Sequence, residues 1–435
     1  MTNKIRLKKN QTVRFLNGRE LKIVSWIGEG GQGIVYKGVD EATGEEFAVK
    51  TSMAQEMVYK QLVRNIESGS PSPAFTWPLF ISERKDDTFC YAMPLVTSRY
   101  KKFGKFMMAK ARFKNMDAMI NAAINLVSAF KLLHNSGFSY QDINEENIFF
   151  DPNNGDVMIC DIENVMGQGY HSGIIGKTRY MAPEIVRGEA MPDKTTDAYS
   201  LALILFMLLI GDHPLEGART NVPCLTNKYD RRFNGEQPLF IFDKENDANR
   251  PMEGIQANAI TLWGCYPAYI RNAFERSFSQ ESLLHRSGRL QEQEWLHLLM
   301  RLKSSIVRCP FCQEEMFMDC HKISRCTECN SSSMASGYLK FKKRFNIDIE
   351  VPIFAGARLF GYHLFEDSSS TQNVCAIVLE KNGKIGLRNN SDVEWVVTSA
   401  DGKKAVRKRP GETSVLGVGF NIDFSNGNIA KIYNL

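Results

Sequence analysis

The first half of the chain changes its hydrophobic pattern once, from strand-like to helix-like. Residues 12–50 alternate apolar and polar positions around glycine turns, which predicts a β-meander. Residues 53–66 follow a helical pattern, and residues 77–95 are strand-like again. From Asp117 to Leu133 the apolar positions recur at helical spacing, and further helical stretches continue to Leu302. The pattern therefore predicts a small β lobe followed by a larger helical lobe.

Beyond residue 302 the pattern changes twice more. Residues 303–340 are rich in cysteine and serine and poor in long apolar helices, and the chain from residue 345 has short β-type runs separated by turn signals such as Asn382-Gly383. We predict an α+β chain with a bilobal fold, a small zinc ribbon and a C-terminal all-β, sandwich-like domain. The expected boundaries are 1–95 for the first lobe, 96–302 for the second, 303–340 for the ribbon and 345–435 for the β domain.

Composition favours a soluble, intracellular protein. The 435 residues are 43% apolar and carry a formal charge of only +5, so we expect no nucleic-acid partner. The charged N-terminal sequence has no signal-peptide pattern, and the longest apolar run, Leu201 to Ile210, is far too short to span a bilayer. Six of the ten cysteines are scattered, which does not fit a disulfide framework. We therefore expect a cytoplasmic protein that does not associate with a membrane.

A glycine-rich loop and a lysine suggest a phosphate-binding site in the β lobe. Gly28, Gly30, Gly33 and Val35 form G-x-G-x-x-G-x-V, and the residues that follow are β-branched and aromatic. A second strand after the loop indicates a hairpin over a nucleotide, whereas a Rossmann loop would continue into a helix. Lys50 ends an apolar strand, from which its ammonium group could reach phosphates. A lysine in this role needs a carboxylate partner, and Glu56, at the start of a helical run, is the candidate; the alternative is a solvated first-turn glutamate.

Three polar residues in the helical lobe have the spacing that phosphoryl transfer requires. Asp142 and Asn147 stand five residues apart before an apolar strand, and Asp161 follows a second apolar strand. Phosphoryl transfer needs a base near the attacking hydroxyl and oxygen ligands for Mg²⁺. We expect Asp142 to orient and deprotonate the hydroxyl, and Asn147 and Asp161 to bind the metal.

Together with Ala182-Pro183-Glu184, these motifs resemble the eukaryotic-type protein kinase family over residues 20–302. The resemblance implies that Asp197 supports the catalytic loop and that Arg289 pairs with Glu184. It also implies that Met93 is the gatekeeper beside a hinge that contains Pro94 and Leu95. The residues it implies for binding ATP are Ile27, Gly28, Gly30, Gly33, Val35, Ala48, Lys50, Met93, Leu95, Asn147 and Asp161.

The chain departs from the family pattern at several positions. Tyr140-Gln141 replaces His-Arg before Asp142, which removes the usual arginine partner of a phosphorylated activation loop. Ile162-Glu163 follows Asp161 in place of Phe-Gly, and glutamate restricts backbone flipping there. Asn144 stands where serine/threonine kinases have a lysine. We predict that Lys177 supplies the missing ammonium group; the alternative is that it points to solvent.

All four central polar residues of the kinase pattern are present, namely Lys50, Asp142, Asn147 and Asp161. The sequence therefore favours a serine/threonine protein kinase that transfers the γ-phosphoryl group of ATP to protein hydroxyl groups. The alternative is a catalytically weak, nucleotide-binding pseudokinase scaffold.

Two C-x-x-C pairs predict a structural zinc site. Cys309 and Cys312 precede Cys326 and Cys329 by 13 intervening residues, and four thiolates favour a closed tetrahedral Zn²⁺ site. Such a site stabilises a segment too short to bury its own core.

The C-terminal domain faintly resembles forkhead-associated domains, which would make Arg388 and Ser391 phosphothreonine contacts; the alternative is an interaction or stabilising module. With the ribbon, an insert containing Pro238 to Asp243 and Asn249 to Pro251 resembles the bacterial kinases of stress and tellurite-resistance gene clusters. That resemblance implies a PP2C-type phosphatase and a von Willebrand A-type protein as partners, besides a protein substrate.

Overall fold

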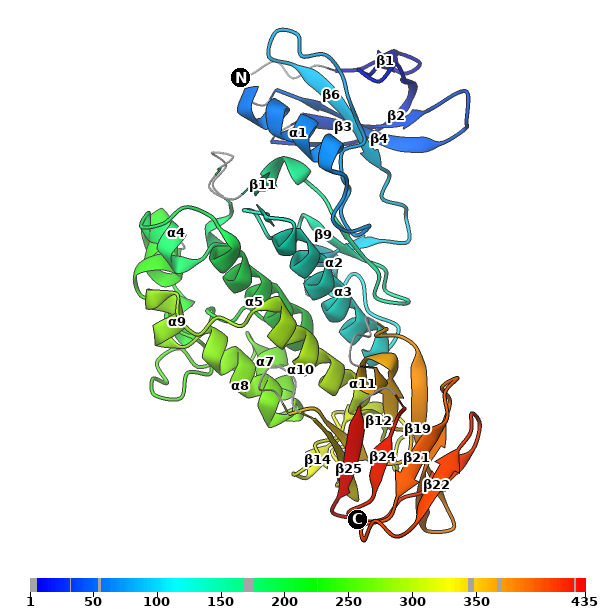
Figure 1. Cartoon of the computed structure of the whole chain (residues 1–435). Helices are drawn as coiled ribbons and strands as arrows, with labels where there is room; N and C mark the ends of the chain where they lie inside the picture. Colours follow the sequence, from blue (N-terminus) through cyan, green and yellow to red (C-terminus); the bar gives the residue numbers. More distant parts are fainter. Residues whose placement is uncertain are drawn as a thin grey trace.

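The computed structural model describes residues 6–31, 33–53, 56–167, 170, 176–224, 226–342, 348–365, 370–425 and 428–435. A small β lobe lies at one end, a larger helical lobe in the middle, and the C-terminal strands lie against the far end of the helical lobe (Figure 1). The predicted order of a β lobe before a helical lobe is what the structure has.

The small lobe is one antiparallel sheet with a helix. Its strand order is β1-β2-β3-β4-β6-β5. Helix α1 buries the stripe Val58, Gln61, Leu62 and Asn65, whose spacing places these side chains on one helical face. The elements are β1 (Thr12–Arg14), β2 (Glu20–Gly30), β3 (Gly33–Val39), β4 (Glu46–Ser52), α1 (Glu56–Ser68), β5 (Phe80–Ile81) and β6 (Phe89–Pro94).

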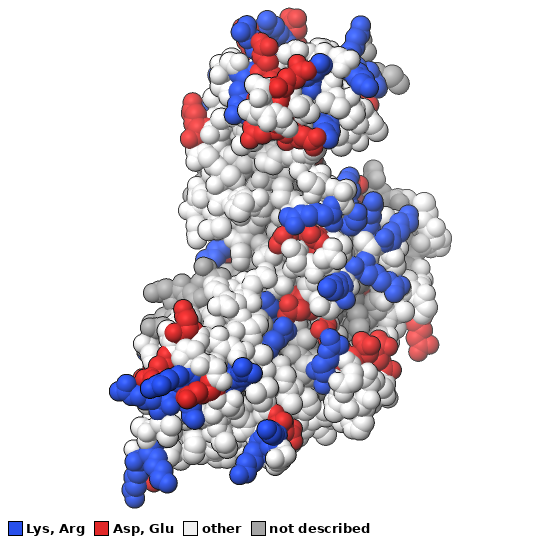
Figure 2. Space-filling view, turned by 90° about the vertical axis from the view of Figure 1, so that its right-hand side faces the viewer, with Lys and Arg blue, Asp and Glu red and all other residues white. Residues whose placement is uncertain are grey.

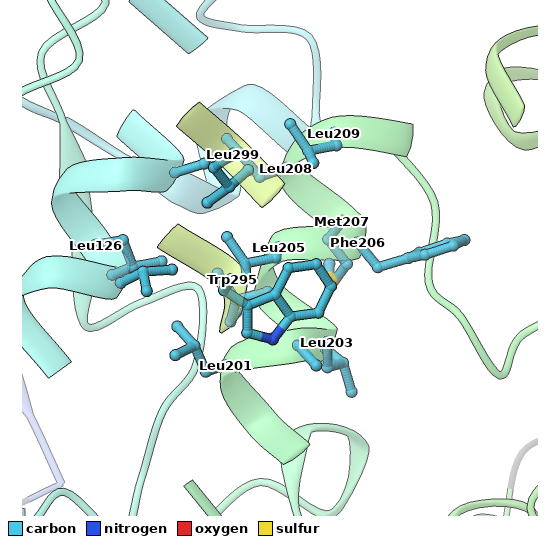
Figure 3. Close-up of a cluster of buried hydrophobic side chains, with 14 of the residues drawn as sticks. Leu126, Leu201, Leu203, Leu205, Phe206, Met207, Leu208, Leu209, Trp295 and Leu299 are labelled. Carbon is cyan, nitrogen blue, oxygen red and sulfur yellow. The ribbon is translucent and has the colours of Figure 1, made fainter. Parts of the chain in front are cut away.

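The helical lobe is built around helix α5, which is buried from Thr196 to Ile210. Asp193 caps its start with a capping box, and Gly211, at φ 83°, ends it. Phe206 from α5 and Trp295 from α10 lie in the apolar cluster between these helices (Figure 3). The helices are α2 (Phe103–Met107), α3 (Met116–Asn135), α4 (Pro183–Arg187), α5 (Lys194–Ile210), α6 (Asn227–Arg231), α7 (Ala257–Leu262), α8 (Ala268–Ser277), α9 (Gln280–His285) and α10 (Glu292–Ser304).

Short strands border the segments that contain Asp142, Asn147 and Asp161. They pair as β10-β9-β7 and β11-β8. Among the described helices, α3 alone is long and apolar enough to cross a membrane, and 61% of its most apolar window is buried in the lobe. Its apolar character therefore matches its packing beside α5 and α10. The strands are β7 (Lys101–Lys102), β8 (Phe138–Ser139), β9 (Ile148–Phe150), β10 (Val157–Ile159) and β11 (Met166–Gly167).

The insert before the last helices is an integral part of the helical lobe. Leu239, Phe240 and Ile241 are buried in the main cluster. Asn249 donates from Nδ2 to the carbonyl oxygens of Leu215 at 2.9 Å and Leu239 at 2.7 Å, which fixes both ends of the insert.

The C-terminal region contains two small hairpins and two antiparallel sheets that share one apolar cluster. The sheet orders are β17-β16-β25-β24-β21-β22 and β18-β19-β20-β23. We expected the ribbon to extend to residue 340, but β16 (Gly337–Phe341) pairs with β17 and β25 and belongs to the larger sheet. The expected start of the β domain, residue 345, lies outside the described residues. The other elements are β12 (Ile306–Arg308), β13 (Glu315–Phe317), β14 (Ser324–Arg325), β15 (Ser332–Ser333), β17 (Glu350–Ile353), β18 (Arg358–Phe360), α11 (Gly361–Leu364), β19 (Val374–Lys381), β20 (Lys384–Asn389), β21 (Trp395–Thr398), β22 (Ala405–Lys408), β23 (Thr413–Val415), β24 (Asn421–Asp423) and β25 (Ile429–Tyr433).

The C-terminal region is fixed to the helical lobe by polar and apolar contacts. Arg358 forms an ion pair with Asp117 at 2.7 Å, and the Glu315 carboxylate accepts a hydrogen bond from the Met116 amide at the start of α3 at 2.6 Å. Phe317 and Tyr362 are buried in the main cluster of the helical lobe. Loss of the C-terminal fold would therefore expose apolar surface of the helical lobe.

Candidate active site

Lys50 lies in the middle of the small-lobe sheet and points towards the large lobe. It pairs with Val35 on β3 and Tyr91 on β6, and its side chain is 5% exposed. Its Nζ atom lies 3.0 Å from Asp161 Oδ1 and 3.1 Å from Glu163 Oε2. Burial alone would lower the pKa of Lys50, but the Glu163 carboxylate, followed by Tyr91 and Asp161, outweighs burial and raises this pKa well above its ordinary value. Lys50 is therefore a charged ammonium between the lobes.

The expected pairing of Glu56 with Lys50 is not found. Glu56 is the first residue of α1, is 62% exposed, and forms an ion pair with Lys60 at 2.7 Å one turn later. The physical reason is helical phase. At roughly 100° per residue, Glu56 lies about 200° around the helix from Val58, which is part of the buried stripe. The alternative reading, a solvated first-turn glutamate, is the one that the structure supports.

Glu163 provides the carboxylate that Glu56 does not. Asp161 adopts a left-handed conformation with φ 58°, and residues Ile162–Asn164 form a single 3₁₀ turn after it. This turn buries Ile162 in the main cluster and directs Glu163, only 2% exposed, to Lys50. Among the described residues, Glu163 Oε1 has no hydrogen-bond partner, so the Lys50 contact is what compensates this buried carboxylate.

The loop that carries Asp142 is held from below by Asp197. The backbone amides of Tyr140 and Gln141 donate to the Asp197 carboxylate at 2.7 and 3.2 Å. Asp197 thus supports the backbone of the Asp142 loop, as the resemblance implied. Burial alone would lower the pKa of His134, but its hydrogen bonds to Asp197 and Glu292 raise it to about 9. A protonated His134 therefore balances the charge of Asp197.

Three amide side chains surround the Asp142 carboxylate. Asn144 donates to Oδ1 at 2.9 Å, and Asn147 and Asn164 each donate to Oδ2 at 3.3 Å. Burial raises the pKa of Asp142 to about 6, against the opposing effect of the Asn144 and Asn147 hydrogen bonds. Near neutral pH the group is mostly ionised and basic enough to accept a proton from a hydroxyl group. Asn164 was not predicted as a site residue, since nothing in its spacing separates it from a surface asparagine.

Lys177 lies near this loop but is engaged elsewhere. Its Nζ atom lies 3.3 Å from a Glu145 oxygen and 2.9 Å from a Glu146 oxygen. Within the described part of the chain, no hydrogen bond or ion pair joins it to Asp142, and Asn144 makes that contact itself. Neither sequence-based alternative describes this arrangement, because Lys177 is neither the partner of Asp142 nor free in solvent.

The residues expected around a nucleotide lie together at the edge of the small lobe. Val35, Ala48, Met93 and Leu95 belong to one apolar cluster, in which Ala48 and Met93 are direct strand partners. Ile27 is 45% exposed on β2. This apolar surface suits the faces of an aromatic base.

Two of the three loop glycines are not required by packing within the protein. A Cβ atom added at Gly28 or Gly30 would meet no heavy atom within 4 Å. At Gly33, by contrast, it would lie 1.8 Å from the carbonyl oxygen of Thr51. Gly33 is therefore needed by the sheet, whereas Gly28 and Gly30 keep the hairpin surface open to a ligand.

Asn147 and Asp161 suit a hard divalent cation. Asn147 uses Nδ2 to donate to Asp142, which leaves its carbonyl oxygen Oδ1 without a donor among the described residues. Asp161 is 38% exposed and uses Oδ1 for Lys50. One amide oxygen and one accessible carboxylate are the ligand types that Mg²⁺ prefers.

The four expected cysteines form one cluster. All four Sγ atoms lie within 4.8 Å of one another, with 3.7 Å between Cys309 and Cys329 and 3.6 Å between Cys312 and Cys326. Zinc–sulfur bonds of about 2.3 Å in a tetrahedron place sulfur atoms about 3.8 Å apart, so this cluster has the size of such a site.

The two expected phosphothreonine contacts of the C-terminal domain do not form one site. Ser391 is 6% exposed, donates to Asn389 Oδ1 at 2.7 Å and accepts from Trp395 Nε1 at 3.1 Å. Arg388 is exposed. The Ser391 hydroxyl therefore has a structural role and is not available for the phosphothreonine contact that the resemblance to forkhead-associated domains implied.

A further implied pair is present in the large lobe. Arg289 contacts both oxygens of Glu184 at 2.8 Å, and both side chains are almost fully buried. This bidentate contact joins α4 to the turn before α10.

A lysine and an aspartate that meet between two lobes, over a loop with a second aspartate and an asparagine, define the core of a phosphotransferase of the protein kinase type. The family model for the protein kinase domain matches residues 21–251, more than half of the chain. The chain belongs to the protein kinase family.

Curated relatives are themselves protein kinases. The chain is 27% identical to serine/threonine-protein kinase AtPK2/AtPK19 of Arabidopsis thaliana over 216 residues, which are 47% of this chain and 44% of the relative. It is 32% identical to protein kinase C delta type of Mus musculus over 112 residues, 25% of this chain and 16% of the relative. It is 29% identical to serine/threonine-protein kinase Sgk1 of Rattus norvegicus over 154 residues, which are 34% of this chain and 32% of the relative. The chain thus spans less than half the length of these relatives.

Proposed function

We propose that this chain is an active, ATP-dependent serine/threonine protein kinase. The observation that carries the proposal is the contact of Lys50 with Asp161. Lys50 Nζ, from the small lobe, lies 3.0 Å from Asp161 Oδ1, which belongs to the large lobe beside the Asp142 loop. The names of its curated relatives support serine and threonine as the acceptors.

Each polar residue has a separate task in the proposed reaction. Lys50 holds phosphate oxygens of the nucleotide, and Glu163 keeps the lysine charged and oriented. Asp142 orients the acceptor hydroxyl and takes up its proton. Asn147 Oδ1 and the Asp161 carboxylate would hold Mg²⁺, which when bound neutralises negative charge on the phosphates.

We also propose a structural Zn²⁺ for the four-cysteine cluster, supported by its sulfur–sulfur distances. The insert and the cysteine pairs support the narrower proposal of a bacterial stress-response kinase in the cytoplasm. Its proposed partners there are a PP2C-type phosphatase and a von Willebrand A-type protein.

A second candidate function is the nucleotide-binding scaffold. Two observations favour it. Glu163 occupies a glycine position of the family, and Lys50 forms an ion pair with Asp161, which is a candidate metal ligand. Incubation with Mg²⁺ and γ-labelled ATP, followed by mass mapping, separates the two. If the chain is an active kinase, phosphoserine or phosphothreonine should form with wild type and be absent with the Asp142→Asn variant. Stabilisation by ATP without any transfer would support the scaffold instead.

A further inference from the structure

The segment between the two lobes and helix α3 is strongly basic. Residues 98–114 contain seven lysines and arginines and no aspartate or glutamate. The segment forms β7 and α2, and its buried Phe103 anchors it to the lobe. Figure 2 shows lysine and arginine side chains gathered on the larger lobe immediately below the small lobe. The cations of the segment are Arg99, Lys101, Lys102, Lys105, Lys110, Arg112 and Lys114.

Most of these cations lack a carboxylate partner. Arg99 lies 3.5 Å from Asp151 and 3.3 Å from Asp156. None of the other six forms an ion pair in the described part of the chain, and of these only Lys101 is even half-buried. Six like charges in fourteen residues repel one another, so a bound anionic partner would remove an unfavourable interaction.

The basic segment borders the catalytic loop. The amide of Gly104, on α2, donates to the carbonyl oxygen of Glu145 at 3.4 Å, three residues after Asp142. Lys102 pairs with Phe149 on β9, the strand that follows Asn147. A polypeptide whose hydroxyl reaches Asp142 can therefore place its neighbouring residues beside the lysines of β7 and α2.

The acidic residues of the catalytic loop do not cancel this field. Glu145 and Glu146 are both engaged by the ammonium group of Lys177, at 3.3 and 2.9 Å. The acceptor side of the site thus has lysines without ion-pair partners on one border and two carboxylates that share one ammonium group on the other.

We propose, resting on the proposed kinase function, that this surface selects acceptor segments rich in aspartate and glutamate. The carboxylates of such a segment bind Lys101, Lys102 and Lys105 and guide the hydroxyl to Asp142. The occupant is a polypeptide rather than a nucleic acid because the aromatic rings of the segment already have partners within the protein. Phe106 stacks on Phe113 with 4.5 Å between ring centres, Phe103 is fully buried, and the Arg99 guanidinium lies 4.6 Å from the centre of the half-buried Tyr100 ring, whereas a binding site for nucleic acid offers aromatic rings on which bases stack.

The test compares matched peptides. Each has one serine, flanked by aspartate and glutamate in one peptide and by asparagine and glutamine in the other. With Mg²⁺-ATP, the wild-type chain is expected to show a kcat/KM at least about tenfold higher for the acidic peptide, a preference that shrinks as salt is raised. Lys102→Glu with Lys105→Glu should abolish the preference, chiefly through KM. Lys403→Glu with Lys404→Glu, on an exposed loop of the C-terminal domain, should keep it.

Equal kcat/KM for the two peptides, or an unchanged preference in the α2 variant, would overturn the proposal. Transfer to neither peptide contradicts the proposed kinase function, and fluorescence anisotropy of the labelled peptides then decides this proposal separately. Binding of the acidic peptide that is lost in the α2 variant supports it. Absence of such binding, or tighter binding of a labelled oligonucleotide of equal charge, contradicts it.

Discussion

Glu163 Oε2 lies 3.1 Å from Lys50 Nζ, and the two side chains are 2% and 5% exposed. The glutamate comes from the turn that also holds Asp161, so the partner of the lysine belongs to the large lobe. Helix α1 contributes no carboxylate to this contact, because Glu56 points to solvent. The position of the Lys50 ammonium group therefore depends on this turn of the large lobe rather than on the position of α1.

Substitution of this glutamate should impair catalysis more than substitution of the helix glutamate. Glu163→Gln removes the buried charge that orients Lys50, and we expect kcat/KM to fall about 10- to 100-fold. Glu56→Gln is the matched control and should stay within about twofold of wild type, since its ion pair with Lys60 is exposed. Steady-state phosphotransfer measures both, and equal losses would restore α1 as the source of the partner.

The rate should depend on the ionisation of Asp142. Its pKa is raised to about 6, so the carboxylate form prevails above this pH and the protonated form below it. The kcat/KM profile is expected to rise through a midpoint near pH 6 and then level off. Asn164→Asp adds a like charge beside Asp142 and should move the midpoint upwards. An acid limb near pH 4 in wild type, or no displacement in the variant, would argue against Asp142 as the base.

The raised pKa also has a consequence for stability. The folded-state pKa of Asp142 lies above the ordinary value of 3.8, so the folded protein binds more protons than the unfolded chain between these two values. The contribution of this group to the free energy of unfolding therefore falls as pH rises from about 4 to 6. Comparison of urea unfolding in wild type and Asp142→Asn across this range isolates it. The difference between the two should change with pH in that window and remain constant above it.

The cysteine cluster should bind one zinc ion per chain and stabilise both the C-terminal region and the helical lobe. Cys309→Ser is expected to abolish zinc in elemental analysis and to lower Tm by more than about 5 °C. The helical lobe should lose stability as well, because Arg358 and Glu315 join the C-terminal region to the start of α3. Cys224→Ser, at an exposed cysteine outside the cluster, is the control. Full zinc content in Cys309→Ser would contradict the site.

The buried pair of the large lobe should matter more than an exposed one. Arg289→Ala removes the bidentate partner of the buried Glu184 and leaves only Arg286, whose Nε atom lies 3.3 Å from Glu184 Oε1, so we expect the free energy of unfolding to fall by about 3 kcal/mol. The exposed pair of Arg276 with Glu294 serves for comparison, where Arg276→Ala should cost about 0–1 kcal/mol. Urea denaturation followed by tryptophan fluorescence gives both values, and similar losses would contradict the assigned burial.

Local motifs made much of this site predictable. Lys50, Asp142, Asn147 and Asp161 follow or precede apolar strands, and that position alone constrains where their side chains point. The predicted pairing of Glu56 with Lys50 was wrong because it considered their separation in sequence and not the helical phase of Glu56. The apolar positions Val58 and Leu62, which define the buried face of the helix, were present in the sequence. Glu163 could not be found in this way, since its contact closes over 113 positions of chain and depends on the left-handed conformation of Asp161.

The C-terminal boundary shows a second limit of sequence patterns. Residues 337–341 alternate buried and half-buried positions, which is typical of a strand but does not identify the neighbours of that strand. Their pairing with β25, about ninety residues later, assigns them to the larger sheet. Partners of a strand that are distant in sequence are determined by tertiary packing, which one sequence does not contain.

The most direct test of the central claim measures transfer from γ-labelled ATP by wild type, Asp161→Asn and Lys50→Met, with nucleotide binding measured in parallel. The account predicts labelled phosphoserine or phosphothreonine with wild type, and a loss of transfer of at least about 100-fold in both variants. Transfer that persists in Asp161→Asn at the wild-type rate would contradict the role given to the Lys50–Asp161 site.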